Sequence, residues 1–144
     1  MAEIRVAALL LRSRMGENMK KLIVTDRAPL AIGPYSQAVE TESLIFTSGV
    51  IPINPVTNEL VLGGIQEQAD QAIANLIELV RAAGREPEDV VKTTVFIKNM
   101  DDFQTVNEVY EKYFTKCFPA RSCVEVSRLP KGVLIEIEAI IGKR

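Results

Sequence analysis

The chain has 144 residues, of which 47% are hydrophobic and 25% charged, a size and composition typical of one globular domain with a sizeable core. Its formal net charge is −2, so no broad basic surface is available for a phosphate backbone and we expect no nucleic acid partner. The sequence contains no histidine, which excludes His-based nucleophiles, His-based acid–base catalysis and most zinc or iron sites.

Residues 1–18 differ in character from the rest of the chain. Their apolar run, VAALLL, is too short for a membrane span and weak for a signal-peptide core, so we expect no membrane association. An Arg-rich transit peptide is one interpretation, against which Glu3 counts. We favour the interpretation that 1–18 is an N-terminal extension, a cloning remnant or an early start codon, and that one functional domain spans 19–144.

The first half of that domain reads as short strands and loops. Residues 21–25 are predicted to form a strand, followed by a Pro/Gly loop over 28–37. Strands are predicted over 37–41 and 44–50, and a loop over 52–64.

The second half contains the helices. Apolar residues at helical spacing predict a helix over 66–83, with Gly84 where a C-terminal cap belongs. The β-branched segment 90–98 predicts a strand, and a second helix is expected from Asp101 or Asp102. The tail over 118–140 predicts two strands joined by a Pro-Lys-Gly turn. The order β-β-β-α-β-α-β-β predicts an α+β fold, with one mixed sheet and both helices on one face.

The last strand has two different faces. One face carries Ile135, Ile137, Ala139 and Ile141, and the other carries Leu134, Glu136, Glu138 and Ile140. The first face belongs against the helices. The second is too apolar for open water and too charged for a core, which favours a subunit interface with polar clefts.

Arg121 and Glu136 are the leading candidates for chemistry. Alternation places Arg121 on the same face of its strand as Cys123. If the two tail strands are neighbours and Arg121 shares a face with Glu136, both line one cleft. A guanidinium suits the grip of a small carboxylate, and a desolvated carboxylate suits the handling of a water. The alternative is an ordinary Arg–Glu ion pair at an interface, and Glu138 competes with Glu136 for the second role.

Other candidates are weaker on pattern alone. Cys123 lacks an activating histidine and reads better as a small packed residue, and with Cys117 it indicates a reduced, intracellular protein. Tyr35 either lies over a cleft or caps the core edge. Ser48 and Gly49 end a strand where a ligand can approach the backbone, or where the chain simply turns. No phosphate loop, metal-ligand cluster or CxxC pair is present, so we expect no metal and no cofactor.

Together these motifs resemble the Rid family, also called YjgF. The resemblance rests on AIGPYSQAV at 31–39, TSG at 47–49, VVKTTVF at 90–96, DDFQTVNEVY at 101–110 and PARSCVEV…LPKG…IEIEAI at 119–140. It runs from about Met19 to the end and leaves 1–18 outside. It implies a chorismate-mutase-like fold, a cytoplasmic homotrimer with a cleft at each subunit interface, and hydrolysis of 2-imino acids to 2-keto acids and ammonia without a cofactor.

The resemblance also implies roles for individual residues. Arg121 matches the family arginine that grips the substrate carboxylate, and Glu136 matches the glutamate thought to hold or activate water. Cys123 matches a position whose backbone contacts the imine nitrogen side. The cleft-lining positions are Tyr35, Ser48 and Gly49. Val50 departs from the glutamine of many relatives, and the TKCF stretch before PAR is shorter than in some members, which affects substrate range rather than reaction type.

Two further hypotheses remain beside the deaminase. A non-catalytic module that binds a small carboxylate, such as a 2-keto acid, would need Arg121 but not Glu136. An RNA-acting translation inhibitor or ribonuclease, as some relatives have been described, is disfavoured by the charge and by the absence of histidine.

Overall fold

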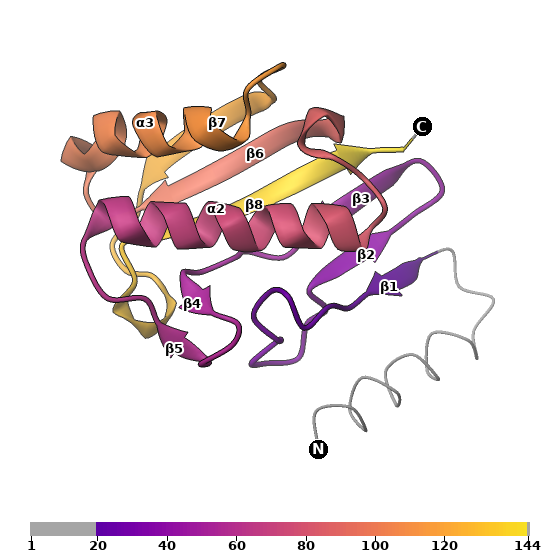
Figure 1. Ribbon diagram of the computed structural model, residues 1–144, viewed down its shortest axis with the longest axis horizontal. Helices are drawn as coiled ribbons and strands as arrows, with labels where there is room; N and C mark the ends of the chain where they lie inside the picture. Colours follow the sequence, from indigo (N-terminus) through magenta and orange to yellow (C-terminus); the bar gives the residue numbers. More distant parts are fainter. Residues whose placement is uncertain (1–19, 144) are drawn as a thin grey trace.

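The computed structural model describes residues 20–143, drawn in colour in Figure 1. The extension predicted at 1–18 lies outside the described residues. The strands and α-helices, in chain order, are β1 (Lys21–Ile23), β2 (Ala38–Glu40), β3 (Leu44–Thr47), β4 (Ile53–Asn54), β5 (Glu59–Leu60), α2 (Ile65–Ala82), β6 (Val90–Ile97), α3 (Phe103–Tyr113), β7 (Ala120–Glu125) and β8 (Ile135–Gly142). Short 3-10 turns are η1 (Pro87–Asp89), η2 (Met100–Asp102) and η3 (Pro130–Gly132).

Six strands form one sheet in the order β1-β2-β3-β8-β6-β7. Strand β7 runs parallel to β6, and the other neighbouring pairs are antiparallel, so the sheet is mixed. Both α-helices cover the same face of this sheet (Figure 1). The predicted α+β class, with one mixed sheet and both helices on one side, is confirmed.

Two details of the structure differ from the sequence analysis, which made neighbouring tail strands a condition of one shared cleft and predicted a plain loop over 52–64. The tail strands β7 and β8 are not neighbours, because β6 lies between them. Helix α3 carries the chain from β6 to a parallel position on one side of that strand, and β8 then occupies the antiparallel position on its other side. In addition, the loop predicted over 52–64 contains a small hairpin, in which β4 pairs with β5.

Helix α2 begins and ends at defined signals. The N–H of Gly64 donates to Glu67 Oε2 over 2.9 Å, which satisfies one free donor at the first turn. At the other end, Gly84 has a φ of 72°. The N–H groups of Gly84 and Arg85 donate to the carbonyls of Arg81 and Val80 over 2.9 and 3.1 Å. This is the Schellman arrangement, and it confirms Gly84 as the predicted terminator.

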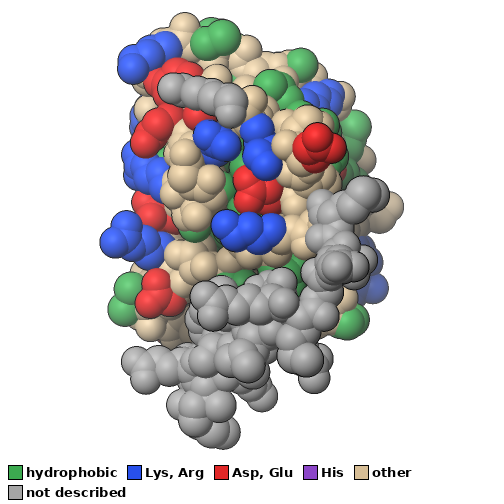
Figure 2. All heavy atoms as spheres, turned by 90° about the vertical axis from the view of Figure 1, so that its right-hand side faces the viewer, with side chains coloured by type: hydrophobic (Ala, Val, Ile, Leu, Met, Phe, Trp, Pro, Cys, Tyr) green, Lys and Arg blue, Asp and Glu red, His purple; other side chains and the backbone are tan. Residues whose placement is uncertain are grey.

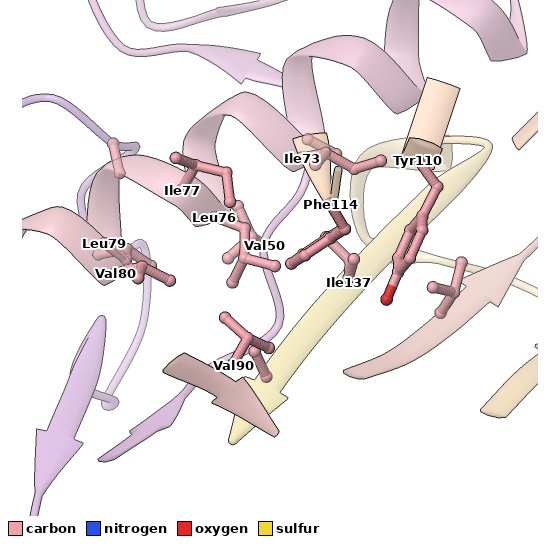
Figure 3. Close-up of a cluster of buried hydrophobic side chains, with 14 of the residues drawn as sticks. Val50, Ile73, Leu76, Ile77, Leu79, Val80, Val90, Tyr110, Phe114 and Ile137 are labelled. Atoms are coloured by element: carbon pink, nitrogen blue, oxygen red, sulfur yellow. The ribbon is translucent and has the colours of Figure 1, made fainter. Parts of the chain in front are cut away.

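The hydrophobic core lies between the helices and the sheet, as Figure 3 shows. Strand β8 alternates buried and half-buried residues along its length. Its buried members are the predicted Ile135, Ile137, Ala139 and Ile141. Helix α3 contributes Val106, Val109 and Tyr110, and the Tyr110 ring lies 4.5 Å from that of Phe114.

The opposite face of the sheet has no covering layer among residues 20–143. Phe46 of β3 is 37% exposed and Val124 of β7 is 40% exposed there. On β8, Glu136, Glu138 and Ile140 are half-buried on this face. We call this surface the open face of the sheet. Its mixture of apolar and acidic groups is the one that the sequence predicts.

The end of the molecule that carries the β1 edge and the C-terminal residues is highly charged. Glu40 lies 3.1 Å from Lys143 Nζ and 3.9 Å from that of Lys21. Figure 2 shows basic and acidic side chains interspersed on this side. Because both signs alternate, the surface is typical of a solvated face rather than of a phosphate-binding one.

Candidate functional site

Arg121 projects from β7 toward the helices. It lies in register with Thr93 of β6, which in turn lies opposite Ala139 of β8. Neighbouring residues in register point to the same side of a sheet, so all three side chains share the helix-covered face.

Helix α3 holds the guanidinium of Arg121 in one orientation. Nη2 of Arg121 donates to Asn107 Oδ1 over 2.7 Å. Its Cζ lies over two aromatic rings, 4.8 Å from the Tyr110 centroid and 5.5 Å from that of Phe103. The aromatic faces and the amide favour the cation without cancelling its charge, so a guanidinium remains available to an anion.

This arginine lines an open hollow of about 390 Å³. The lining residues are Asn107, Tyr110, Glu111, Phe118, Pro119 and Arg121. Phe118 forms an apolar rim and is 64% exposed. A small carboxylate fits such a space and would meet a planar fork of donors there.

The backbone of β7 adds polar groups at the edge of the sheet. The N–H of Val126 donates to the carbonyl of Ile97 over 2.9 Å. Parallel pairing engages alternate residues, so the backbone groups of Arg121, Cys123 and Glu125 point away from β6, toward the free edge. The edge therefore presents donors and acceptors at Cys123, the position whose backbone the family resemblance implicates.

The sulfur of Cys123 is not suited to a nucleophilic role. The residue is half-buried and packs against the core. Burial raises the pKa of the Cys123 thiol, and the nearby charge of Arg121 offsets this only in part. A thiol that stays protonated is a poor nucleophile, which supports the interpretation of Cys123 as a packed residue.

Glu136 lies on the open face of the sheet, opposite Phe96 of β6. Desolvation raises the pKa of its carboxyl, and the charge of Glu138 raises it further. Among residues 20–143 it has no hydrogen-bond or ion-pair partner. A half-buried carboxylate of raised proton affinity is suited to accept a proton from water.

Gly49 makes room for that carboxylate. A Cβ atom on Gly49 would overlap Glu136 Oε1 and lie 2.7 Å from Glu136 Cδ. The contact is maintained by Val50, whose N–H donates to Ile137 O over 2.7 Å and whose carbonyl accepts from Ile137 N–H over 3.0 Å. The backbone of Val50, rather than its side chain, therefore fixes the segment beside β8.

Tyr35 and Ser48 lie close to the same glycine. Together with Gly49 they line a narrow hollow of about 30 Å³, room for one or two water molecules. Ser48 Oγ donates to the carbonyl of Ser36 over 2.6 Å, and Tyr35 Oη accepts from the N–H of Ile32 over 3.2 Å. Ser48 thus ties the loop before β2 to the end of β3, and Tyr35 makes its contact within that loop.

Gln37 anchors this loop from within. Its buried amide donates to the carbonyls of Thr25, Ala28 and Pro29 over 3.0, 3.3 and 2.8 Å. Its Oε1 accepts from the N–H of Thr25 over 2.9 Å. The loop that carries Tyr35 is therefore held in shape by a side chain that we did not single out from the sequence.

The structure therefore divides the predicted site into two groups. Tyr35, Ser48, Gly49 and Glu136 belong to one neighbourhood, and Arg121 and Cys123 lie on the helix-covered face. The condition that Arg121 shares a face with Glu136 is not met within one chain. Their register partners on β6, Thr93 and Phe96, are three residues apart, and an odd separation places side chains on opposite faces.

Asn107 and Tyr110 were missed as site residues. Asn107 reads as an ordinary polar residue of an amphipathic helix. The available signal was its spacing, since Phe103, Asn107 and Tyr110 recur at i, i+4 and i+7 and so share one face of α3. A polar residue within an apolar stripe indicates a specific partner, and here that partner is Arg121.

Neither a metal site nor a membrane span appears in the part of the chain that the structure describes. Residues 20–143 contain no group of three or more His, Cys, Asp or Glu side chains placed to hold a metal ion. None of their helices combines the length and apolar character that crossing a membrane requires.

Comparison with known proteins identifies the family. The family model described as Endoribonuclease L-PSP matches residues 25–142. The chain belongs to this family, the Rid family. Over 129 residues it is 54% identical to the 2-iminobutanoate/2-iminopropanoate deaminase of Escherichia coli K12, an alignment that covers 88% of this chain and all of the relative.

Solved structures of Rid relatives have the same fold. The crystal structure of the YjgF gene product of E. coli is similar with a TM-score of 0.82 at 53% identity, covering 86% of this chain and 99% of the relative. That of E. coli TdcF with bound serine has a TM-score of 0.83 at 48% identity, with the same coverage. The match spans nearly the whole of each relative, so the Rid core of this chain has no large insertion or deletion.

Proposed function

We propose that this protein hydrolyses 2-imino acids, such as 2-iminobutanoate and 2-iminopropanoate, to 2-keto acids and ammonia. The observation that carries the proposal is the Arg121 guanidinium, held by Asn107 and Tyr110 at the mouth of an open hollow. This is a preorganised carboxylate-binding site. The name of the relative that is 54% identical supports the reaction class. The family match to 25–142 supports residues 19–144 as the functional domain.

We further propose that the active cleft forms between subunits of a chorismate-mutase-like homotrimer. One chain places Arg121 and Glu136 on opposite faces of its sheet. A second chain that packs on the open face would bring its own Arg121 to the Glu136 group. The apolar residues exposed on the open face, among them Phe46 and Val124, support such an interface.

In the proposed mechanism, Arg121 binds the substrate carboxylate and places C2 near Glu136 of the neighbouring chain. Glu136 accepts a proton from water as the water oxygen bonds to C2 of the iminium. The same carboxyl then returns the proton to nitrogen. As the C–N bond breaks and ammonia leaves, the carboxylate takes the proton of the C2 hydroxyl, and the C2 carbonyl forms. An iminium carbon is already electrophilic, so orientation and a positioned base suffice, and no covalent enzyme intermediate is needed.

The remaining residues have supporting roles. Gly49 leaves space for the Glu136 carboxylate. Tyr35 and Ser48 shape the adjoining hollow. We assign the contact with the nitrogen side of the substrate to the edge backbone of Cys123, a role that the register of β7 supports.

A trapping experiment tests the proposal. Threonine dehydratase with threonine generates the 2-imino acid, and semicarbazide traps it as a semicarbazone. We expect the intact protein to outcompete the trap, and folded Arg121→Ala and Glu136→Ala variants to fail. If only the Arg121→Ala variant lost activity, Glu136 would not be the residue that handles the water. A protein that binds 2-ketobutyrate without affecting the trap would be a small-carboxylate binding protein rather than a deaminase.

A further inference from the structure

We propose that Tyr110, fixed by a hydrogen bond to Thr93, sets the plane of the Arg121 guanidinium for carboxylate binding. This inference rests on the role given to Arg121 under the proposed function. It gives a positioning role to Tyr110 and Thr93, which in the proposed mechanism contact neither the reacting carbon nor the water.

The hydroxyl groups of Thr93 and Tyr110 form a buried pair. Thr93 Oγ1 and Tyr110 Oη lie 2.8 Å apart, and either can donate. Thr93 is 0% exposed and Tyr110 is 4% exposed. Burial raises the pKa of the Tyr110 phenol, so the group remains a neutral hydroxyl at physiological pH. A buried hydroxyl needs a partner, and this bond satisfies both residues.

Thr93 and Tyr110 both contact or neighbour Arg121. Thr93 lies beside Arg121 in the β6–β7 register, and the Tyr110 ring lies 4.8 Å from the Arg121 Cζ. Strand β6 thus holds the ring, and the ring supports the guanidinium that projects from the next strand. Figure 3 shows the Tyr110 side chain extending from α3 with its hydroxyl toward the sheet.

Among residues 20–143, the other contacts of the guanidinium engage only one of its N–H donors. Asn107, one helical turn before Tyr110, accepts a single N–H from Nη2. The Phe103 ring lies 5.5 Å from Cζ. A guanidinium has five N–H donors in a rigid plane, so the remaining donors are available to a carboxylate in a plane that the Tyr110 ring sets.

Tyr110→Phe would retain the ring but lose the hydrogen bond to Thr93 that fixes it. Replacement of Thr93 by valine would remove the same bond from the other side with almost no change in volume. Since each change deletes one shared interaction, the two should weaken carboxylate binding equally, and together no more than either alone.

The test compares Thr93→Val, Tyr110→Phe, their double variant and Tyr110→Leu in the full chain. Calorimetry gives the Kd for 2-ketobutyrate, and the trapping assay gives KM and kcat. We expect Kd and KM to rise together by about 3- to 10-fold in both single variants and in the double variant, with kcat nearly constant. Tyr110→Leu should weaken binding by a further factor of about 5, because the cation–π contact is lost.

Two control variants separate positioning from stability. Val109→Ala removes buried volume from the same helix, and it should lower Tm while leaving Kd unchanged. Thr57→Val, in the exposed β4–β5 turn, should change neither.

Several results would overturn the inference: an unchanged Kd in Thr93→Val and Tyr110→Phe, additive effects in the double variant, or an intact protein that fails to bind 2-ketobutyrate. A fall in kcat at constant KM would also overturn it, since that would place the pair in the chemistry. In a further outcome, the intact protein shows no deaminase activity and still binds 2-ketobutyrate more tightly than the Thr93→Val variant. That result would contradict the proposed reaction and support the positioning role of Tyr110.

Discussion

At the scale of single residues, the contact between Gly49 and Glu136 is the most sensitive to substitution. In Gly49→Ala the new Cβ would overlap the Glu136 carboxylate and push it from its position. Displacement of a catalytic group by about 1 Å can cost about 100-fold in rate, so we expect a loss of at least about 10-fold in kcat/KM with little change in Tm. Gly142→Ala is the control, because its Cβ would meet neighbours no closer than 3.5 Å. Equal activity in both variants would contradict the assigned position of Glu136.

The pH dependence of activity should report the environment of Glu136. Desolvation and the charge of Glu138 both raise the pKa of Glu136, so its basic form appears at a higher pH than that of an exposed glutamate. We expect Glu138→Gln to shift the acidic limb of the kcat/KM profile to lower pH, because one raising influence is removed. Glu59→Gln, in the exposed hairpin, is the matched control. A limb that moves to higher pH, or not at all, would exclude Glu136 as the titrating base.

The same pKa shift gives a sign for stability. A carboxyl whose pKa is raised by folding binds its proton more tightly in the folded chain. Its stabilising contribution is therefore complete at low pH and is lost as the pH rises through the folded pKa. Glu136→Gln should remove this dependence, which Tm measured across that pH range would show.

At the scale of elements, Asn75 joins α2 to the β4–β5 hairpin. Its buried Nδ2 donates to the carbonyls of Ile51 and Ile53 over 3.1 and 2.8 Å. In Asn75→Ala both carbonyls lose a buried donor, so we expect the free energy of unfolding to fall by about 1–3 kcal/mol. Denaturant titration measures this, with Gln104→Ala on exposed α3 surface as the control. Equal stability of the two variants would mean that water replaces the amide.

The β4–β5 hairpin is an element that the sequence did not predict. Helix α2 and strand β6 follow from apolar periodicity and a glycine cap, which are local properties. Strands of two residues, such as β4 and β5, are too short for any period to appear. Strand order is likewise not local. Alternation fixes which side chains share a face of one strand, but not that β6 lies between β7 and β8. The sequence therefore predicted which neighbours Arg121 and Glu136 each have on their own strand. It did not predict that the two residues lie on opposite faces of the sheet.

At the scale of the whole molecule, the open face should decide the oligomeric state. Phe46→Asp places a charge in the exposed apolar surface of β3, so we expect smaller particles by sizing and light scattering, with loss of activity. Val56→Asp is the matched control, since Val56 is 90% exposed in the hairpin turn. A monomer with full activity would contradict the shared cleft.

Complementation gives a sharper test of the shared cleft. Arg121→Ala and Glu136→Ala chains are each expected to be inactive alone. In randomly mixed cyclic trimers, about one quarter of the clefts would combine an intact Arg121 with an intact Glu136 from the next chain. Co-expression should therefore restore about one quarter of the activity, whereas a cleft built within one chain would recover nothing.

Strand β6 lies beside Arg121 on one face of the sheet and beside Glu136 on the other. Thr93 on one side lies beside Arg121, and Phe96 on the other side lies opposite Glu136, three residues further along. In the proposed trimer these two faces serve different clefts, about 10 Å apart along one extended strand. The strand then acts as a shared wall between two reaction chambers. A substitution in β6 would therefore affect two active clefts at once. An inhibitor bound in one cleft would contact the strand that also lines the neighbouring cleft.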